Sequence, residues 1–210
     1  PCMDNDVLRR GKPTVHVQFG EARALLAGDA LQALAFELLT PEGADVPPAM
    51  QAELCRLLAR AAGAQGMAGG QAIDLASVGK PLSETELRGM HERKTGALLQ
   101  ASVRMGAACG SAVTPAARAA LDDFGAVIGL AFQVVDDILD VTADSAELGK
   151  TAGKDAAADK PTYVWLLGGP AAQALADAHC SQARAALDAC GLPRVERWRA
   201  LADVVVKRSN

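Results

Sequence analysis

Three aspartates at the end of an apolar segment are the residues of this sequence best placed to do chemistry. Asp136, Asp137 and Asp140 form a D-D-x-x-D pattern, and Gln133 precedes them. On a helix, this spacing places the four side chains along one face. Carboxylates four residues apart repel each other, and near the C-terminal end of a helix they also face the negative end of its dipole. The arrangement is therefore costly unless water or a cation neutralises it.

A divalent cation is the interpretation that we favour for these aspartates. Mg²⁺ binds oxygen ligands, retains several waters and commonly shares its site with substrate phosphates. The alternative is a solvated outer face of the helix that binds nothing. Against this alternative, residues 124–135 carry no charged side chain, so that the helix enters an apolar core just before the aspartates. We therefore predict a magnesium site that binds a diphosphate.

Basic residues elsewhere in the chain could neutralise such a diphosphate, because Lys and Arg bind phosphate oxygens well. The candidates are Arg9, Arg10, Lys94, Lys150, Lys154 and Lys160. Taken singly, each is as readily a solvated surface charge. The segment 149–154 lacks the residue order of a P-loop and a preceding strand, so ATP binding is not expected.

Helices must position these residues, because the composition favours them. Half of the 210 residues are apolar, mostly Ala, Leu and Val, and only 3% are aromatic. Ala and Leu are strong helix formers. We expect helices over 20–39, 49–64, 83–109, 114–141, 170–189 and 193–207, with loops over 1–18 and 142–161. The helix at 20–39 is apolar almost all round, which predicts deep burial, and Asp29 within it is expected to be at least partly buried.

Together these elements predict an all-α bundle of mostly antiparallel helices around a deep central cavity, formed by a single domain over residues 1–210. Ser83 with Glu86, and Thr114 with Pro115, are start signals for its two central helices. The chain opens at Pro1 as though inside a loop, without an initiator methionine. We expect that N-terminal helices of the bundle are missing.

Charge and cysteine content narrow the range of partners. A net charge of −4 with mixed signs predicts no nucleic-acid partner, and no uncharged stretch is long enough for membrane insertion. The cysteines are odd in number and lack C-x-x-C spacing, which favours free thiols in the cytoplasm over disulfides or zinc. The Glu-x-x-His pattern of di-iron bundles is absent.

The sequence resembles the trans-isoprenyl diphosphate synthases, and most closely the bacterial farnesyl diphosphate synthases, in five motifs spread over nearly the whole chain. The motifs are MDNDVLRRGKPT at 3–14, LAGDAL at 26–31, GGQAIDL at 69–75, KTGAL at 94–98 and FQVVDDILD at 132–140. The resemblance implies an isoprenoid synthase fold. It also implies condensation of an allylic diphosphate (dimethylallyl or geranyl diphosphate) with isopentenyl diphosphate, giving farnesyl diphosphate.

The resemblance also implies roles for single residues. The implied metal ligands are Asp4, Asp74, Asp136, Asp137 and Asp140, and the implied ions are three Mg²⁺ with substrate bound. The implied substrate-binding residues are Arg9, Arg10, Gln71, Lys94, Thr95, Gln133, Lys150 and Lys160. Among these, Lys94, Thr95 and Gln133 would act catalytically beside the allylic cation. The resemblance further implies a homodimer. Val7 and Val135 depart from the common family pattern without removing a ligand.

Other functions stay open at this point. A geranylgeranyl or other short-chain diphosphate synthase would differ in residues that the family places before Pro1. A class I terpene cyclase shares the aspartates and the helices, but Lys94 with Thr95 and the glycine-lysine pair at 149–150 argue against it. A non-catalytic regulatory subunit should have lost aspartates that are present here. A plain helical scaffold is the remaining alternative.

Overall fold

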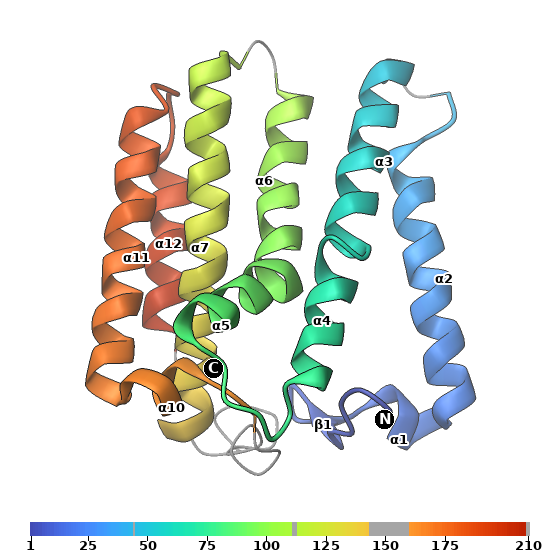
Figure 1. Ribbon diagram of the computed structural model, residues 1–210. Coiled ribbons are helices and arrows are strands. Elements are labelled where there is room, and N and C mark those ends of the chain that lie inside the picture. Colours follow the sequence, from blue (N-terminus) through green and yellow to red (C-terminus); the bar gives the residue numbers. More distant parts are fainter. Residues whose placement is uncertain (44, 111–112, 143–159, 209–210) are drawn as a thin grey trace.

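The computed structural model describes residues 1–43, 45–110, 113–142 and 160–208 and shows a helical bundle whose longer helices run alternately up and down (Figure 1). Its elements are β1 (Leu8–Arg9), β2 (Lys12–Pro13), α1 (Val15–Phe19), α2 (Glu21–Leu39), α3 (Pro48–Ala62), α4 (Met67–Ala76), α5 (Glu84–His91), the π-helical turn η1 (Glu92–Gly96), α6 (Ala97–Cys109), α7 (Pro115–Thr142), α10 (Tyr163–Leu167), α11 (Gly169–Ala189) and α12 (Glu196–Lys207). The all-α prediction is confirmed. Lys150 and Lys154 lie outside the described residues.

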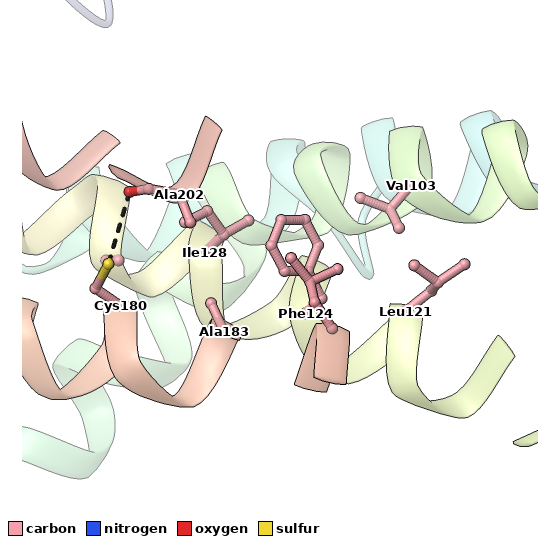
Figure 2. Close-up of a cluster of buried hydrophobic side chains, with 9 residues drawn as sticks. Val103, Leu121, Phe124, Ile128, Cys180, Ala183 and Ala202 are labelled. Carbon is pink, nitrogen blue, oxygen red and sulfur yellow. Dashed lines mark hydrogen bonds between the residues drawn. The ribbon is translucent and has the colours of Figure 1, made fainter. Parts of the chain in front are cut away.

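The long helix α7 is the centre of the bundle. It packs against α6 on one side and against α11 and α12 on the other (Figure 1). Its start is capped as expected, because the Thr114 hydroxyl accepts a hydrogen bond from the backbone N–H of Ala117. Phe124 is fully buried, meets Trp198 edge to face, and contributes to an apolar cluster with Leu121 and Ile128 (Figure 2). The apolar half of α7 is therefore the part that anchors it in the core.

A second apolar cluster supports the C-terminal half of α7. It contains Leu87, Met90, Val134, Val135, Tyr163, Ala172 and Ala176. These residues come from α5, α7, α10 and α11, which meet at the lower end of the bundle in Figure 1. The aspartates of α7 emerge from this cluster, so a close-packed layer holds them in place.

The predicted helix over 83–109 is present but is interrupted by a π-helical turn. The capping box of Ser83 and Glu86 starts α5, and η1 then joins α5 to α6 without a break. A π-turn inserts one residue into the helical repeat and is frequent at functional sites. In this chain the turn contains Lys94 and Thr95.

Several expectations for the N-terminal part are wrong. Every residue of α2 keeps part of its surface exposed, and Asp29 is exposed as well. A helix that is apolar all round is buried only if other elements cover it, and α2 packs mainly on α1 and α3. The segment 1–18 is also not a plain loop, because β1 and β2 form an antiparallel hairpin that pairs Leu8 with Pro13.

Candidate functional site

The aspartate face of α7 is held in the protein interior rather than in solvent. Asp137 is 1% exposed and Asp140 is 4% exposed, while the Asp136 side chain keeps 30% of its surface. A solvated outer face is therefore excluded as an account of the pattern. Buried carboxylates persist when hydrogen bonds or cations compensate them, and both kinds of partner are present here.

Asp137 is bonded to the protein through both of its oxygens. Oδ2 accepts a hydrogen bond from the backbone N–H of Tyr163 at 2.8 Å. Oδ1 accepts one from the side-chain amide of Gln133 at 3.0 Å. The first bond joins α7 to the start of α10, an element that the sequence did not predict, and the second lies within α7.

Asp136 meets a cation from the other end of the chain. The guanidinium of Arg208, just after α12, lies 3.3 Å from Asp136 Oδ1 and donates to the backbone carbonyl of Phe132 at 3.0 Å. It also lies over the Phe132 ring, 3.8 Å from the ring centroid. Burial lowers the pKa of Arg208, opposed by the charge of Asp136. Position 136 thus accepts positive charge in this structure.

Asp74 on α4 lies between two lysines. Its Oδ2 is 2.8 Å from Lys94 Nζ and 3.5 Å from Lys160 Nζ, and Asp74 is 3% exposed. The arrangement makes Asp74 the residue that positions these two ammonium groups. Gln71 lies one turn earlier on the same helix.

Two close backbone approaches bring α4, η1 and α7 together. A Cβ added to Gly70 would lie 2.2 Å from the backbone nitrogen of Lys94, and one added to Gly129 would lie 2.7 Å from the Cα of Gly96. Glycine is the residue that permits such contacts. As a result, Thr95 Oγ1 on η1 reaches Gln133 Oε1 on α7 at 3.0 Å.

His91 is a buried residue of this region that sequence reasoning missed. It is 5% exposed, stacks on the Tyr163 ring with centroids 5.6 Å apart, and has Nε2 4.0 Å from Asp137 Oδ2. Its ring nitrogens have no hydrogen-bond partner among the described residues. Burial, with the charge of Lys94 adding to it, lowers the pKa of His91 to about 3. The sequence does not mark His91 as a site residue, because no second histidine lies at the spacing of a metal-binding pair.

The N-terminal candidates lie at the same end of the bundle as this network. Figure 1 shows β1 and the C-terminal end of α7 at its lower end. Asp4, Arg9 and Arg10 are all exposed, and Asp4 accepts a hydrogen bond from the backbone of Asp6. The structure therefore brings together Gln71, Asp74, Lys94, Thr95, Gln133, Asp136, Asp137, Asp140 and Lys160.

The carboxylate oxygens of this site suit a hard cation that keeps water and substrate oxygens among its ligands. Within the described residues, no three acidic, histidine or cysteine side chains converge into a complete metal cage. Mg²⁺ does not require one, because it is usually bound by one or two carboxylates together with water and substrate phosphates. Asp136, already paired with a guanidinium, and Asp140 offer carboxylate oxygens at the end of α7. The residues present thus fit magnesium.

Two cavities lie at different ends of α7. One of about 620 Å³ is lined by Lys80, Asp140, Lys160, Thr162 and Trp165 among others, beside the aspartates. The other, of about 560 Å³, lies between α3, α6 and α7 and includes Asp122. Asp122 and Asp136 are 14 residues apart, roughly 20 Å along a helix. Only the first cavity adjoins the candidate chemistry.

The polyprenyl synthetase family model matches residues 2–189 of the sequence. The chain belongs to the polyprenyl synthetase family. It is 52% identical to a probable farnesyl diphosphate synthase of Bradyrhizobium diazoefficiens over 213 aligned positions, which cover 100% of this chain and 62% of that protein. It is also 46% identical to geranylgeranyl pyrophosphate synthase 7 of Arabidopsis thaliana, covering 100% of this chain and 61% of that protein.

Solved polyprenyl synthetase-like structures share the fold. A geranyltransferase of Helicobacter pylori, solved in complex with magnesium and isoprenyl diphosphate, matches 98% of this chain and 66% of its own with a TM-score of 0.86 at 37% identity. The chain thus spans about three fifths of the length of the curated relatives above. None of the described helices has the length and apolar character needed to cross a membrane.

Proposed function

We propose that the protein is a prenyltransferase that condenses dimethylallyl or geranyl diphosphate with isopentenyl diphosphate to give farnesyl diphosphate. The observation that carries the proposal is the convergence of three kinds of group at one end of the bundle. These are the aspartates of α7, the lysines paired with Asp74, and the polar pair of Thr95 and Gln133. The anionic leaving group and the allylic cation would each have a complementary environment there.

Asp136 and Asp140 are the proposed magnesium ligands contributed by α7, with Asp4 contributed from the N-terminal side. Bound magnesium would supply Lewis acidity that neutralises the departing diphosphate. The family resemblance suggests three such ions. Asp74 would act indirectly, by holding Lys94 and Lys160 toward the same group.

The chain's own residues would then carry out the remaining steps. Lys94 and Lys160 would stabilise negative charge on the leaving diphosphate, as preorganised cations do in a poorly hydrated site. The oxygens of Thr95 and Gln133 would face the positive allylic carbon. The apolar layer around Val134 and Tyr163 excludes water, which protects a reactive cation from hydrolysis. Arg9, Arg10, Gln71 and Lys150 are proposed to bind the diphosphates.

The direct test is product analysis with the complete polypeptide. We expect geranyl diphosphate, labelled isopentenyl diphosphate and Mg²⁺ to give labelled farnesyl diphosphate, and omission of Mg²⁺ to abolish it. Farnesyl diphosphate offered alone should give no cyclic terpene. Absence of any condensation product would contradict the proposal and favour a non-catalytic subunit.

A geranylgeranyl product is the second candidate, because one relative in the comparison is named as a geranylgeranyl pyrophosphate synthase. The same assay separates the two by chain length. A C20 product that accumulates while farnesyl diphosphate is consumed would replace farnesyl diphosphate as the proposed product.

We also propose a cytoplasmic homodimer. The five cysteines are free thiols, which fits a reducing compartment. The exposed apolar side chains of α1 and α2 could form the contact between subunits, since large apolar patches commonly mark interfaces. They are Val15, Val17, Phe19, Leu25, Leu26, Leu31, Leu34 and Leu38. Light scattering on the purified protein should give twice the monomer mass, and a monomer would refute this proposal.

A further inference from the structure

Three hydrogen bonds connect the start of α10 to η1 through two side chains of α7. The backbone N–H of Tyr163 donates to Asp137 Oδ2 at 2.8 Å. Gln133 Nε2 donates to Asp137 Oδ1 at 3.0 Å. Thr95 Oγ1 then donates to Gln133 Oε1 at 3.0 Å. This series of bonds begins at a residue that is 1% exposed and ends at a proposed catalytic hydroxyl.

The backbone N–H of Tyr163 sets the direction of all three hydrogen bonds. A backbone N–H can only donate, and a carboxylate has acceptor atoms only. Asp137 therefore presents an acceptor to Gln133, which must turn its NH₂ group toward Asp137 and its carbonyl toward Thr95. That carbonyl takes the hydroxyl hydrogen of Thr95. The Thr95 oxygen is left with lone pairs, which are the groups that a developing carbocation requires.

We propose that Asp137 is a positioning residue that fixes the hydrogen-bond direction at Gln133 and Thr95, rather than a magnesium ligand. The inference rests on the proposed function, because it concerns the cation formed in that reaction. Asp136 and Asp137 are adjacent in sequence but differ in environment. The Asp136 side chain is 30% exposed and paired with Arg208, whereas Asp137 is enclosed by α5, α7 and α10.

The rings of His91 and Tyr163 keep Asp137 enclosed. They stack 5.6 Å apart, and His91 Nε2 approaches Asp137 Oδ2 at 4.0 Å. A ligand to a hydrated Mg²⁺ ion needs access to water and substrate oxygens. Asp137 has almost none, and it does not line the cavity beside the aspartates, whereas Asp140 does although it is 4% exposed. The Asp137 oxygens already accept bonds that hold neighbouring groups in place.

Asp137→Asn tests the inference because it preserves shape and changes the direction of donation. The carbonyl of the new amide would accept from Tyr163, so that its NH₂ group faces Gln133. Gln133 would then turn its own carbonyl toward position 137 and its NH₂ toward Thr95, and the Thr95 hydrogen would point at the cation. We expect kcat to fall about 10- to 100-fold. The KM values and the Mg²⁺ concentration for half-maximal activity should stay within about threefold of wild type.

A matched rescue exchanges the amide of position 133 and the carboxylate of position 137. In the double variant Asp137→Asn with Gln133→Glu, the carboxylate at 133 accepts from the amide at 137 and from Thr95. The original direction at Thr95 is restored, and we expect kcat to return to within about fivefold of wild type. Gln133→Glu alone places two carboxylates together and should be less active and less stable than the double variant.

The experiment measures kcat, KM and Mg²⁺ dependence for the complete polypeptide, with Asp136→Asn as the comparison for a metal ligand. Asp136→Asn should raise the Mg²⁺ requirement about tenfold or more. If Asp137→Asn raises it equally, Asp137 is a ligand and the inference is wrong. A double variant that is no better than Asp137→Asn, whether folded or not, also overturns it. A wild-type protein without prenyl transfer refutes the proposed function instead.

Discussion

Gly70 is the residue whose replacement best separates backbone geometry from side-chain chemistry at this site. In Gly70→Ala, the new Cβ would lie 2.2 Å from Lys94 N and 2.5 Å from Lys94 Cα, whereas ordinary contact begins at 3.4 Å. Both atoms belong to the backbone of η1 and cannot rotate away. Helix α4 and η1 must therefore separate by about 1 Å.

The separation should lower both activity and stability. Gly70 and Asp74 are the buried residues of α4 and lie one turn apart on the same face, so Asp74 moves with Gly70. The 2.8 Å contact between Asp74 and Lys94 would be lost. Overpacking of this kind costs about 1–3 kcal/mol of unfolding free energy. A misplacement of about 1 Å in a catalytic site can lower kcat on the order of 100-fold.

Urea unfolding and steady-state prenyl transfer would measure both effects. Gly106→Ala is the matched control, because Gly106 is in helix α6 and a Cβ there meets nothing within 4 Å. Alanine favours helix over glycine, so the control should gain up to about 1 kcal/mol and keep its kcat. A Gly70→Ala protein with unchanged kcat and stability would refute the close approach of α4 and η1.

Two further predictions concern His91 and Arg208. Because the pKa of His91 is about 3 in the folded protein against 6.5 in a model compound, the unfolded chain binds more protons between these values, and stability should fall as pH drops below 6.5. The unfolding free energy at pH 7.5 exceeds that at pH 5, and His91→Phe should reduce this difference by about 2 kcal/mol. If urea titrations give the same difference for the variant and the wild type, His91 is not a neutral buried side chain. Arg208→Gln should remove the contact with Asp136. The Kd for Mg²⁺, measured with a non-cleavable allylic diphosphate, should then fall about fivefold, which corresponds to about 1 kcal/mol of binding free energy. Calorimetry showing weaker binding would mean that Arg208 contributes to the site instead of competing for it.

Sequence reasoning predicted the central part of the molecule well. The cap at Thr114 and the helical spacing of Gln133, Asp136, Asp137 and Asp140 gave the bounds and the polar face of α7, which the structure confirms. These features are local, because they depend on residues within one helix. The contact between Thr95 and Gln133 spans 38 positions, and only the family resemblance indicated it.

The failures arose where a neighbouring element decides the outcome. Helix α4 was missed because Gly69 and Gly70 lower helix propensity, although close packing against η1 requires a glycine at position 70. Helix α10 was missed because it has only five residues, too few for a periodic pattern. The exposure of α2 could not be predicted. Its sequence shows that the helix is apolar but does not show which other elements cover it.

Arg208 is a residue of the candidate site that the sequence could not predict, because a distant helix positions it. A basic residue near the end of the chain carries no local signal, yet it reaches Asp136 across 72 positions of sequence. Such a contact depends on how α12 packs on α7, which is settled by tertiary structure. Residue type and family motif thus suggested the candidate residues for the chemistry, whereas the residues that contact and position them could not be predicted from the sequence.

The measurement that tests the central claim most directly compares two aspartates of the same helix. Asp136 is part of the proposed magnesium site, whereas Asp123 is an exposed residue of the same helix, 13 positions earlier. We expect Asp136→Ala to lower the kcat of prenyl transfer about 100-fold or more in the complete polypeptide, and Asp123→Ala to keep kcat within about twofold of wild type. A decrease of less than about tenfold for Asp136→Ala would contradict the account, since the aspartate face would then not be the site at which the diphosphate is held.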